Sequence, residues 1–489
     1  MLKLALFTDI HYIIDSNSGK RKAHMGRILL RKAILRINLE IQPDLTIVLG
    51  DLIDDDASPQ AEAQLTELAR DLGKLDSGLI VLPGNHDPAP DVFYRILPQL
   101  PDPWLDIKDC RIIPFLDAEA PEWNAVRSAD DLRRMRLARK GFDGTIIALQ
   151  HVPLSPPELE LCRFNLTNAA DVIEIMRGNN IQLVLGGHEH DGFDHEQDGI
   201  RYFCAGALCE APFRYYEIEI DAGRTEIREH QIQWPASLQL MDLHSHTEFA
   251  YCSQDMELAL TPLIAREIGL DGVAITEHSG QLYFSRDDFW SAEYIHRGIK
   301  GAASKHNRRD EYLRQARQLR ADDVCIGLEV DCDAHGDPVM RPNDREDFDV
   351  LLGALHYMPI HEIRNQDPEK VYDLFLAQME RFTACGIDVL AHPFRLLSVN
   401  GLPIPERVWR ALLELLRINH VATELNFHHI APQSEYVRAC IDAGVKITLG
   451  SDAHQIHKIG ELGPHLRLLQ ELGYDGELKD ILFDPRKNK

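Results

Sequence analysis

The sequence contains no long apolar run. No stretch approaches the roughly 18 consecutive apolar residues that a membrane-spanning helix needs, so we expect no membrane span. The short apolar stretch of residues 1–7 breaks at Asp9 and His11, and no small-residue cleavage site follows it. It therefore predicts a first strand and not a signal peptide.

Cysteine pairs and cationic residues are also scarce. The nine cysteines form no CxxC pairs, which is typical of reduced thiols in a cytoplasm and argues against a disulfide framework. Lysine and arginine number 52 against 78 aspartate and glutamate residues, so the formal net charge is −26 at pH 7. Such a surface repels long nucleic acid and favours a small phosphorylated substrate. Acidic residues that only confer solubility would give the same balance, and composition does not indicate an oligomeric state.

The chain is too long for one hydrophobic core. Its 489 residues predict two large domains, or three, and the best boundary lies near the Trp-Pro-Ala-Ser sequence of residues 234–237. Before it, residues 215–220 and 225–231 alternate like edge strands joined by an Ala222-Gly223 turn. After it, a new apolar run leads into a histidine motif. We therefore predict domains at residues 1–234 and 238–489.

In the first half, apolar runs end repeatedly at polar motifs. The runs at residues 2–7, 45–49, 79–82, 146–149 and 183–185 lead respectively to Asp9, Asp51, Asn85, His151 and His188. Helical patterns lie between them at residues 28–41 and 61–72. Short buried strands that present polar side chains at their carboxyl ends are typical of an α/β architecture.

The second half repeats this pattern more regularly. Seven apolar runs end at polar residues, which are His244, Glu277, Glu329, His356, His392, Glu424 and Asp452. Helix-like stretches separate most of them, for example residues 258–268, 371–383 and 408–416. Seven βα units with the polar motifs at one end predict a barrel whose site lies on its C-terminal face.

The polar motifs of the first half suit a pair of metal ions. They are Asp9-x-His11, Gly50-Asp51, Gly84-Asn85-His86-Asp87, His151 and Gly187-His188-Glu189-His190. Hard oxygen ligands mixed with imidazoles suit Mn, Fe or Zn. One shared carboxylate can bridge two ions about 3.5–4 Å apart, which is the separation in two-metal hydrolases.

This motif set resembles the calcineurin-like metallophosphoesterase family over about residues 1–210. The resemblance implies an α/β sandwich in which one metal is bound by Asp9, His11, Asp51 and His190. It implies that Asn85, His151 and His188 complete a second metal, with Asp51 bridging. His86 would stabilise the transition state or protonate the leaving group, and Asn85 is also a candidate substrate contact. The motif order is similar to that of the bacterial cyclic-nucleotide phosphodiesterase branch.

The motifs of the second half hold more ligands than one ion can use. They are Asp242-x-His244-x-His246, Glu277-His278, Glu329, His356, His392-Pro393 and Asp452-x-His454. Six imidazoles with two or three carboxylates predict two or three metals, with Glu329 as a plausible bridge.

This second set resembles the PHP family, named for polymerase and histidinol phosphatase, over about residues 238–460. The resemblance implies a distorted (β/α)7 barrel, in which His244, His246, Glu329 and Asp452 bind a first metal. It implies that His356 and His392 share Glu329 around a second metal, and that His278 and His454 bind a third. The sequence departs from the common pattern in two places. Residues 251–255 stand where many relatives have a further His or Asp, and either Cys252 or Asp255 could serve as that ligand of the third metal. Glu277 stands where the family usually has aspartate, and it either binds metal or lies beside the site.

Positive partners for phosphate are few. Arg395 follows the His392-Pro393 motif, and we expect it to contact phosphate. Basic clusters at residues 19–36 and 297–309, the latter including Lys305, are more simply interpreted as solvated helix faces. Aromatic residues at 283, 284, 289 and 290 form either a substrate-binding wall or core packing. The histidines outside the motifs, including His428 and His429, are interpreted as surface or core residues.

Two hydrolytic sites on one chain suggest consecutive steps. We expect the first domain to open a small phosphodiester, including a cyclic or nucleotide diester, and the second to act as a phosphomonoesterase. Asp51, His86 and Glu329 are the candidate catalytic residues. Two alternatives remain: an oligonucleotide-processing nuclease, or one active hydrolase beside a regulatory binding domain.

Overall fold

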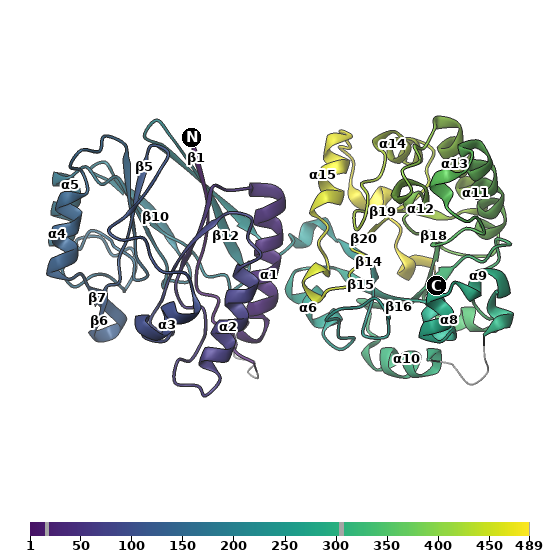
Figure 1. Cartoon of the computed structure of the whole chain (residues 1–489), viewed down its shortest axis with the longest axis horizontal. Helices are drawn as coiled ribbons and strands as arrows, with labels where there is room; N and C mark the ends of the chain where they lie inside the picture. The colour runs from purple at the N-terminus through teal and green to yellow at the C-terminus, as the bar shows by residue number, and fades with distance from the viewer. Residues whose placement is uncertain (15–18, 303–307, 489) are drawn as a thin grey trace. The chain divides into compact units, whose positions relative to one another are not determined.

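The computed structural model describes residues 1–14, 19–302 and 308–488. The chain divides into two compact units, Met1–Gln233 and Trp234–Lys489 (Figure 1). Lys305 of the second basic cluster lies outside the described residues, as does His306. Within the described part of the chain, no helix is both long enough and apolar enough to cross a membrane. All nine cysteines are free thiols.

The first unit contains two stacked β-sheets. One sheet has the strand order β13-β12-β1-β2-β3, with bounds Arg224–Gln231, Arg214–Asp221, Leu2–Phe7, Leu45–Leu49 and Gly78–Leu82. The other has the order β10-β11-β9-β8-β5-β4, with bounds Phe193–Gln197, Ile200–Cys204, Leu183–Gly186, Thr145–Leu149, Cys110–Pro114 and Leu105–Ile107. A short hairpin joins β6 (Ala118–Ala120) to β7 (Asn124–Val126). The expectation that residues 215–220 form an edge strand is wrong, because β12 pairs with β1 on one side and β13 on the other.

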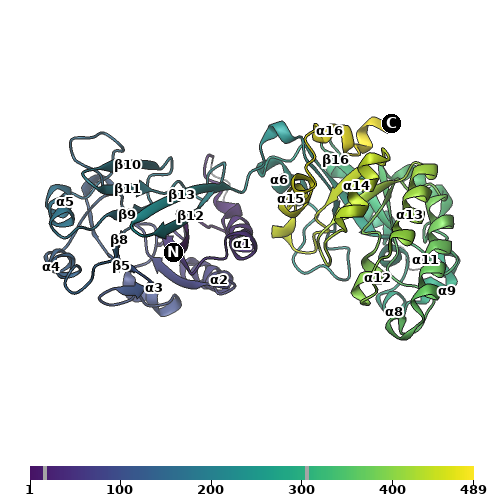
Figure 2. The ribbon, with the colours of Figure 1, turned by 90° about the horizontal axis from the view of Figure 1, so that it is seen from above.

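Alternate residues of the strands form the core between the two sheets. Leu2, Leu4 and Leu6 of β1 pack in one cluster with residues of β8 and β9, such as Ile147 and Leu185. This alternation follows from the two-residue period of a strand. The opposite face of the second sheet packs against α4 (Ala129–Leu137) and α5 (Ala169–Gly178). Figure 2 shows this pair on one side of the sheets, with α1 (Gly26–Arg36) and α2 (Ala61–Leu72) on the other.

Helix boundaries in the first unit follow the apolar periodicity closely. The helix expected at residues 61–72 is confirmed as α2. The helix expected at residues 28–41 begins earlier, at Gly26, and its last turn, Ile37–Ile41, is a π-helix. The short helix α3 covers Pro90–Ile96 and begins with proline, which suits the first turn because its missing N–H has no partner there.

The second unit is a seven-stranded parallel sheet curled into a barrel, as the sequence predicts. Its strands run in chain order from β14 to β20, with bounds Met241–Ser245, Gly272–His278, Val324–Asp331, Val350–Ala354, Val389–Leu390, Ala422–Asn426 and Ile447–Gly450. The first and last strands meet where the Asp452 N–H donates to the His244 carbonyl at 2.8 Å and the His246 N–H donates to the Ala453 carbonyl at 3.1 Å. These two bonds hold the ends of the sheet together.

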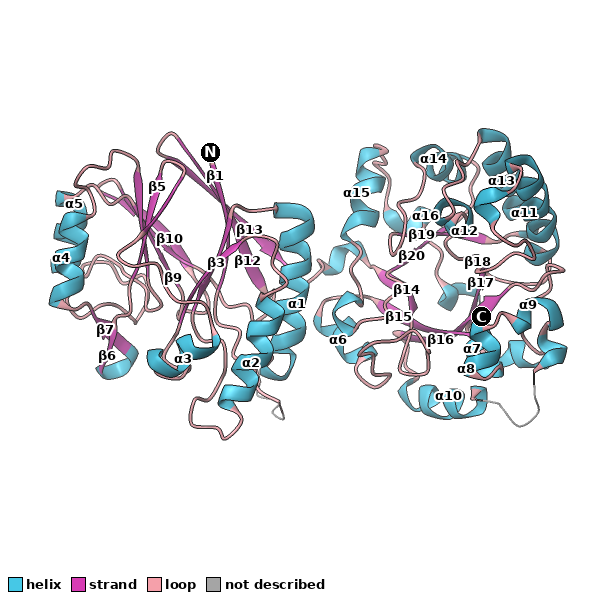
Figure 3. Ribbon diagram, in the orientation of Figure 1, coloured by secondary structure: helices cyan, strands magenta, loops and turns pink. Residues whose placement is uncertain are grey.

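Helices surround this ring of strands (Figure 3). They are α6 (Thr261–Glu267), α7 (Ser279–Tyr283), α8 (Arg286–Trp290), α9 (Glu293–Arg297), α10 (Arg309–Ala316), α11 (Pro368–Thr383), α12 (Arg395–Val399), α13 (Glu406–Asn419), α14 (Ser434–Asp442), α15 (Gly463–Glu471) and α16 (Leu478–Ile481). Because every strand of a parallel barrel runs the same way, the residues after the strands gather at one end.

Candidate metal centres

The first cluster lies at the carboxyl ends of the central strands of the first unit. His11 Nε2 lies 3.2 Å from His190 Nε2 and 3.4 Å from Asp51 Oδ2. Asp9 Oδ1 lies 3.5 Å from His190 Nε2 and 3.7 Å from His11 Nε2. These four side chains therefore converge on one point, as expected for ligands of one ion.

A second group of side chains adjoins the first through the same aspartate. His151 Nε2 lies 3.4 Å from Asp51 Oδ2 and 3.1 Å from Asn85 Oδ1. The ring of His188 packs against that of His151, with centroids 5.0 Å apart. Asp51 Oδ2 is thus equally distant from His11 and His151, one imidazole from each group. This is the position of a bridging carboxylate.

Backbone strain marks the same residues. The φ angle is +55° at Asp9, +47° at His11, +53° at Asp51 and +69° at His188. Left-handed backbone is uncommon for residues other than glycine, and such strain concentrates at functional sites. In the second unit, His392 (φ +29°) and Asp452 (φ +51°) share this property.

The buried carboxylates of the first cluster favour positive charge around them. Burial opposes the charged form of His11, but its hydrogen bonds with Asp54 and Asp9 outweigh this effect and raise the pKa of His11 to about 9. Burial likewise opposes charge on His151, yet the carboxylate of Asp51 raises the pKa of His151 to about 9. His188 differs, because burial and the charge of His151 lower its pKa to about 4.

Unsatisfied buried atoms test whether this cluster fits metal ions. Asp9 Oδ1 and His188 Nε2 are buried and have no hydrogen-bond partner among the described residues. A buried acceptor without a partner costs free energy unless another group satisfies it. The donor set of carboxylate, amide and imidazole groups matches what Mn, Fe and Zn bind. The residues therefore fit a metal pair.

Three further carboxylates orient this cluster, and of these only Asp87 stands in a motif that the sequence analysis named. Asp54 Oδ1 lies 3.0 Å from His11 Nδ1, and Glu210 Oε1 lies 2.7 Å from His190 Nδ1. The carboxylate of Asp87 accepts the backbone N–H groups of Leu52 and Gly84 at 2.9 Å each. Such partners fix the orientation of metal-binding imidazoles. The sequence signal for Asp54 is its position three residues after Asp51, whereas Glu210 lies 20 residues after His190 and its spacing gives no such signal.

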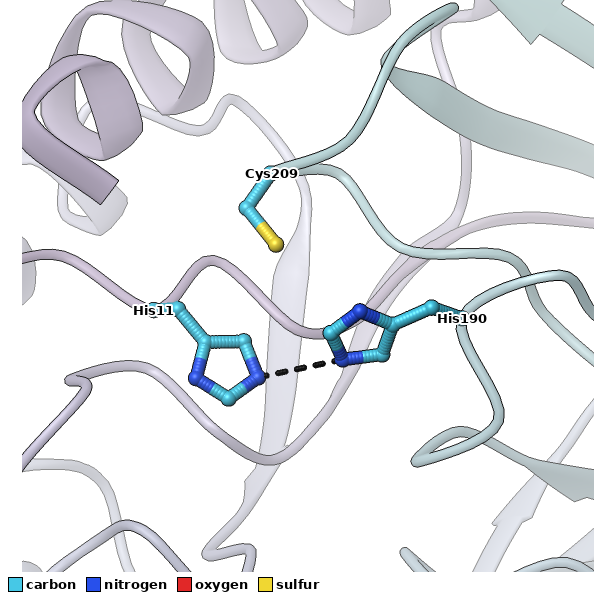
Figure 4. Close-up of side chains that lie close together, drawn as sticks. All are labelled: His11, His190 and Cys209. Atoms are coloured by element: carbon cyan, nitrogen blue, oxygen red, sulfur yellow. Dashed lines mark hydrogen bonds between the residues drawn. The ribbon is translucent and has the colours of Figure 1, made fainter. Parts of the chain in front are cut away.

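The sequence analysis also did not identify Cys209 as a residue of this cluster. Figure 4 shows its sulfur directed toward the rings of His11 and His190. The ligand atoms of these three residues all lie within 4.8 Å of one another. Burial, and then the charge of Asp9, raise the pKa of the Cys209 thiol well above its usual value.

His86 lies beside the bridging aspartate. Its backbone N–H donates to Asp51 Oδ1 at 2.9 Å, and its Nδ1 lies 2.7 Å from the carbonyl oxygen of Asp54. Because a carbonyl oxygen only accepts, Nδ1 carries the proton, and Nε2 is left to exchange a proton with a substrate. A cavity of about 400 Å³ adjoins the cluster, lined in part by Asn85 and His151.

Glu329 stands at the centre of the second cluster. Its Oε1 lies 2.9 Å from His392 Nε2 and 3.2 Å from His356 Nε2. Its Oε2 lies 2.5 Å from His278 Nδ1, 3.6 Å from His244 Nε2 and 3.7 Å from His246 Nε2. The two oxygens of one carboxylate therefore face two groups of imidazoles.

Asp452 forms a second focus of this cluster. Its Oδ1 lies 3.1 Å from His246 Nε2, 3.4 Å from His454 Nδ1 and 3.7 Å from His244 Nε2. Burial opposes charge on His246, but the hydrogen bond with Asp452 raises the pKa of His246 to about 9. Burial and the charge of His246 lower the pKa of His454 to about 2.

The second cluster also contains buried atoms that lack partners. Within the described ranges, they include His244 Nε2, His246 Nδ1, Glu277 Oε2, His278 Nδ1, Glu329 Oε2 and His392 Nδ1, none with a hydrogen bond of acceptable geometry. In His244 and His356, by contrast, the Nδ1 atom has a carboxylate partner. His244 Nδ1 lies 2.8 Å from Glu424 Oε1, and His356 Nδ1 lies 2.7 Å from Asp331 Oδ1. These bonds aim both Nε2 atoms at Glu329. This cluster fits metal ions as well.

The structure distinguishes the residues that the sequence left ambiguous. Cys252 Sγ lies 3.4 Å from His278 Nε2, whereas Asp255 Oδ1 accepts the backbone N–H of Ile456 at 2.9 Å. Cys252 therefore faces the cluster, while Asp255 holds two loops together. Glu277 uses Oε1 to accept from the Thr247 N–H at 2.5 Å, and its Oε2 lies 3.9 Å from His246 Nδ1. Glu277 is thus beside the cluster and not at its focus.

A cavity of about 750 Å³ opens onto the second cluster. It is lined by His278, His356, Asp452 and His454, and its wall includes Arg395, Phe289 and Trp290. Of the four aromatic residues that the sequence analysis considered for this wall, Phe289 and Trp290 line the cavity. Tyr283 and Phe284 are buried in the core instead.

Two histidines outside the motifs line this cavity, which corrects their interpretation as ordinary surface or core residues. The ring of His428 lies 5.0 Å from that of His454, and its Nδ1 is buried without a partner in the described structure. His429 Nε2 lies 2.9 Å from Arg395 Nη2. The adjacent Asn426, whose amide donates to Asp452 Oδ2 at 3.3 Å, directs this loop toward the cluster.

The first basic cluster is not a simple solvated face, whereas Arg297 of the second is exposed on α9, as expected. In the first cluster, Arg27 Nε lies 2.6 Å from Asp71 Oδ2, Lys20 Nζ lies 2.9 Å from Glu210 Oε2, and Lys32 is fully buried. In the second, Arg297 pairs with Glu293 at 2.7 Å. Most of this positive charge is therefore neutralised by neighbouring carboxylates.

Comparisons with known proteins match each unit separately. Residues 2–192 match the family model of calcineurin-like phosphoesterases, and residues 242–428 match that of the PHP domain. A probable cyclic nucleotide phosphodiesterase from Rhodococcus erythropolis is 27% identical over 192 residues, which are 37% of this chain and 63% of the relative. A cAMP/cGMP dual specificity phosphodiesterase from Mycobacterium tuberculosis is 28% identical over 199 residues, which are 39% of this chain and 60% of the relative. The chain thus spans less than two thirds of the length of either relative.

Solved structures similar to this chain include a dimetal phosphatase from Danio rerio, with 15% identity and a TM-score of 0.40. That similarity covers 47% of this chain and 96% of the other. A purple acid phosphatase from yellow lupin seeds has 11% identity and a TM-score of 0.37, and the similarity covers 47% of this chain and 51% of the other.

Proposed function

We propose that this chain, whose two units match the family models of calcineurin-like phosphoesterases and of the PHP domain, is a metal-dependent phosphoester hydrolase whose two domains catalyse consecutive steps. The first opens a small phosphodiester, including a cyclic nucleotide, to a monoester. The second releases inorganic phosphate from that monoester. The names of the relatives support a cyclic-nucleotide substrate for the first domain.

The observation that carries this proposal is the repeated use of one buried carboxylate between two groups of imidazoles. Asp51 occupies that position in the first cluster and Glu329 in the second. The two clusters share no residue, so each can support its own reaction.

In the first domain we assign two ligand groups that share Asp51. The first comprises Asp9, His11 and His190, and the second comprises Asn85, His151 and His188. When bound, the ions supply an activated water and neutralise charge on the phosphoryl oxygens. In its protonated form, with the Nδ1–H held by the Asp54 carbonyl, His86 can donate the proton on Nε2 to the poor leaving oxygen of the diester and become neutral.

In the second domain we assign His244, His246, His278, His356, His392, His454, Glu329 and Asp452 as ligands of two or three ions. Arg395 lies on the cavity wall, where its guanidinium can bind phosphate oxygens in a fork. Phe289 and Trp290 offer apolar faces for the organic part of the monoester.

The test uses two variants of nearly identical shape to the native residues. Purified chain is loaded with Mn²⁺ and given cyclic nucleotides and nucleoside monophosphates, and products are separated by chromatography. Asp51→Asn should stop diester opening while monoester hydrolysis continues, and Glu329→Gln should do the reverse. The exposed carboxylates Asp91 and Glu435, each in the first turn of a helix, provide the matched controls Asp91→Asn and Glu435→Gln.

Two results would contradict the division of labour. One is loss of both activities in either variant while the controls remain active. The other is cleavage of short oligonucleotides without cleavage of small diesters, which would make the chain a nuclease. If the native chain hydrolyses only diesters or only monoesters, the result would favour one hydrolase domain beside a binding domain.

A further inference from the structure

Cys209 is held rigidly against the first metal centre. Its backbone N–H donates to the carbonyl oxygen of Asp9 at 3.0 Å, and its own carbonyl accepts the N–H of Lys22 at 2.8 Å. Its side chain is fully buried. The next residue, Glu210, holds His190 through a 2.7 Å contact. The segment that carries the thiol therefore also orients one of the candidate ligands.

The spacing of the thiol suits coordination of a shared ion. Its sulfur and the ring nitrogens of His11 and His190 lie within 4.8 Å of one another (Figure 4). Zinc–sulfur and zinc–nitrogen bonds of about 2.3 and 2.0–2.1 Å set an upper limit of about 4.4 Å on the separation of a sulfur and a nitrogen bound to one ion. The three side chains therefore need only small shifts to bind the same ion.

Asp9 gives a second, independent indication of a ligand at this point. Its Oδ1 is fully buried, faces His11 and His190 at 3.7 and 3.5 Å, and has no hydrogen-bond partner in the part of the chain that the structure describes. An acceptor in that state requires a cation or a donor in the space it faces. The Cys209 sulfur borders the same space.

We propose that the thiolate of Cys209 is a further ligand of the ion bound by Asp9, His11 and His190, and that it makes this centre prefer zinc or cobalt over manganese. The inference rests on the proposed metal pair of the first domain. As the sulfur–metal bond forms, the thiol proton leaves to solvent. A bound cation reverses the effect of the neighbouring carboxylates, since a coordinating thiol is deprotonated outright.

The preference follows from ligand chemistry. Thiolate is a soft ligand that favours zinc, whereas carboxylate and water suit manganese. The alternative is that Cys209 only fills space, because buried cysteine often behaves as a small apolar residue. A space-filling thiol would give no spectral signal from the metal, and its removal would weaken the binding of both ions alike.

Cobalt spectroscopy on the full chain separates these alternatives. Cys252→Ser first removes the thiol beside His278, so that Cys209 is the thiol facing the metals in the clusters described above. We expect metal-free protein of this variant to develop a thiolate-to-cobalt charge-transfer band in the near ultraviolet as Co²⁺ is added. Cys209→Ser and Cys209→Ala, each introduced into that chain, should abolish the band. Cys110→Ser, a buried control at the start of β5, should retain it.

Metal affinity provides a second measurement that requires no substrate. Cys209→Ala should weaken Zn²⁺ binding at the first centre by more than about tenfold, since loss of even an outer partner of a metal ligand costs 10–100-fold. Binding of Mn²⁺ should change less than about twofold. Competition with a chromophoric chelator gives both values, and circular dichroism verifies folding.

The outcomes distinguish this inference from the proposed function. Absence of the band in the Cys252→Ser chain, with Co²⁺ bound, would overturn the role of Cys209 even if neither variant at position 209 folds. Equal losses of Zn²⁺ and Mn²⁺ affinity would also overturn it, and both results leave the hydrolase intact. Failure of the first domain to bind any divalent ion would overturn both proposals.

Discussion

Glu424 contacts two candidate ligands of the second cluster, His244 and His392, although the sequence analysis did not assign it as a ligand. Its Oε1 lies 2.8 Å from His244 Nδ1, and its Oε2 accepts the backbone N–H of His392 at 2.8 Å. Because a carboxylate only accepts, His244 carries its proton on Nδ1, which leaves Nε2 bare toward Glu329 and Asp452. We predict that Glu424→Gln weakens metal binding at this centre.

The magnitude follows from the two bonds. Glutamine has nearly the same shape but offers one oxygen and one NH₂ group. Either the His244 ring N–H or the His392 backbone N–H would therefore face the NH₂ group, which cannot accept its hydrogen bond. The space permits no easy rearrangement, since a Cβ added at Gly450 would lie 1.9 Å from Glu424 Oε1. Loss of such a partner costs 10–100-fold in metal affinity, or about 1.4–2.8 kcal/mol at 1.4 kcal/mol per tenfold.

The assay is competition between the chain and a chelator, with bound metal counted by mass spectrometry. Glu414→Gln is the matched control, because Glu414 is exposed on the surface of α13 and pairs only with Arg417 in the contacts that the structure gives for it. Metal affinity in Glu424→Gln within about twofold of the native value would refute the reasoning. A loss confined to the first domain would refute it equally.

The remaining predictions concern catalysis, substrate binding and stability. His86→Ala should lower kcat for cyclic nucleotides by about 10²–10⁴-fold. It should have much less effect on a diester with a p-nitrophenolate leaving group, which needs no proton, and equal losses on both substrates would argue against proton donation. Arg395→Ala should raise KM for monoesters, since a hydrogen bond to a charged group contributes about 1.5–3 kcal/mol. Arg395→Lys should restore part of the affinity, and an unchanged KM in the alanine variant would remove Arg395 from the phosphate site. Asp71→Asn should lower the free energy of unfolding by about 1–3 kcal/mol, because the buried carboxylate contacts Lys74 at 2.7 Å and Arg27 at 2.6 Å. Burial opposes its charge, but these contacts lower the pKa of Asp71 below its usual value, so its contribution is present above the unfolded-state pKa of about 3.9 and disappears as the pH falls through the folded-state pKa. Urea unfolding monitored by circular dichroism at pH 7 and near pH 3 measures this difference, and a gap between variant and native chain that does not shrink in acid would contradict it.

Local patterns in the sequence determined the strands and the residues that follow them. The run of residues 45–49 followed by Gly50 and Asp51 predicts a buried strand and a turn, and β2 has those bounds. The helix at residues 61–72 also follows from its own periodicity. These features are set by residues near one another in the chain, where the period of the apolar side chains fixes the element and the motif fixes its end. The motif sets also resembled those of the calcineurin-like metallophosphoesterase and PHP families.

Contacts between distant segments were decided only by the tertiary structure. The pairing of β12 with β1 brings the segment after β11 beside Asp9, and this places Cys209 against His11 and Glu210 against His190. Barrel closure likewise brings Glu424 against His244 and brings His428 beside His454. No spacing in the sequence encodes these contacts, because they depend on strand order and on the loops that connect the strands. The sequence thus identified the candidate metal ligands, whereas the fold determined which other residues contact and orient them.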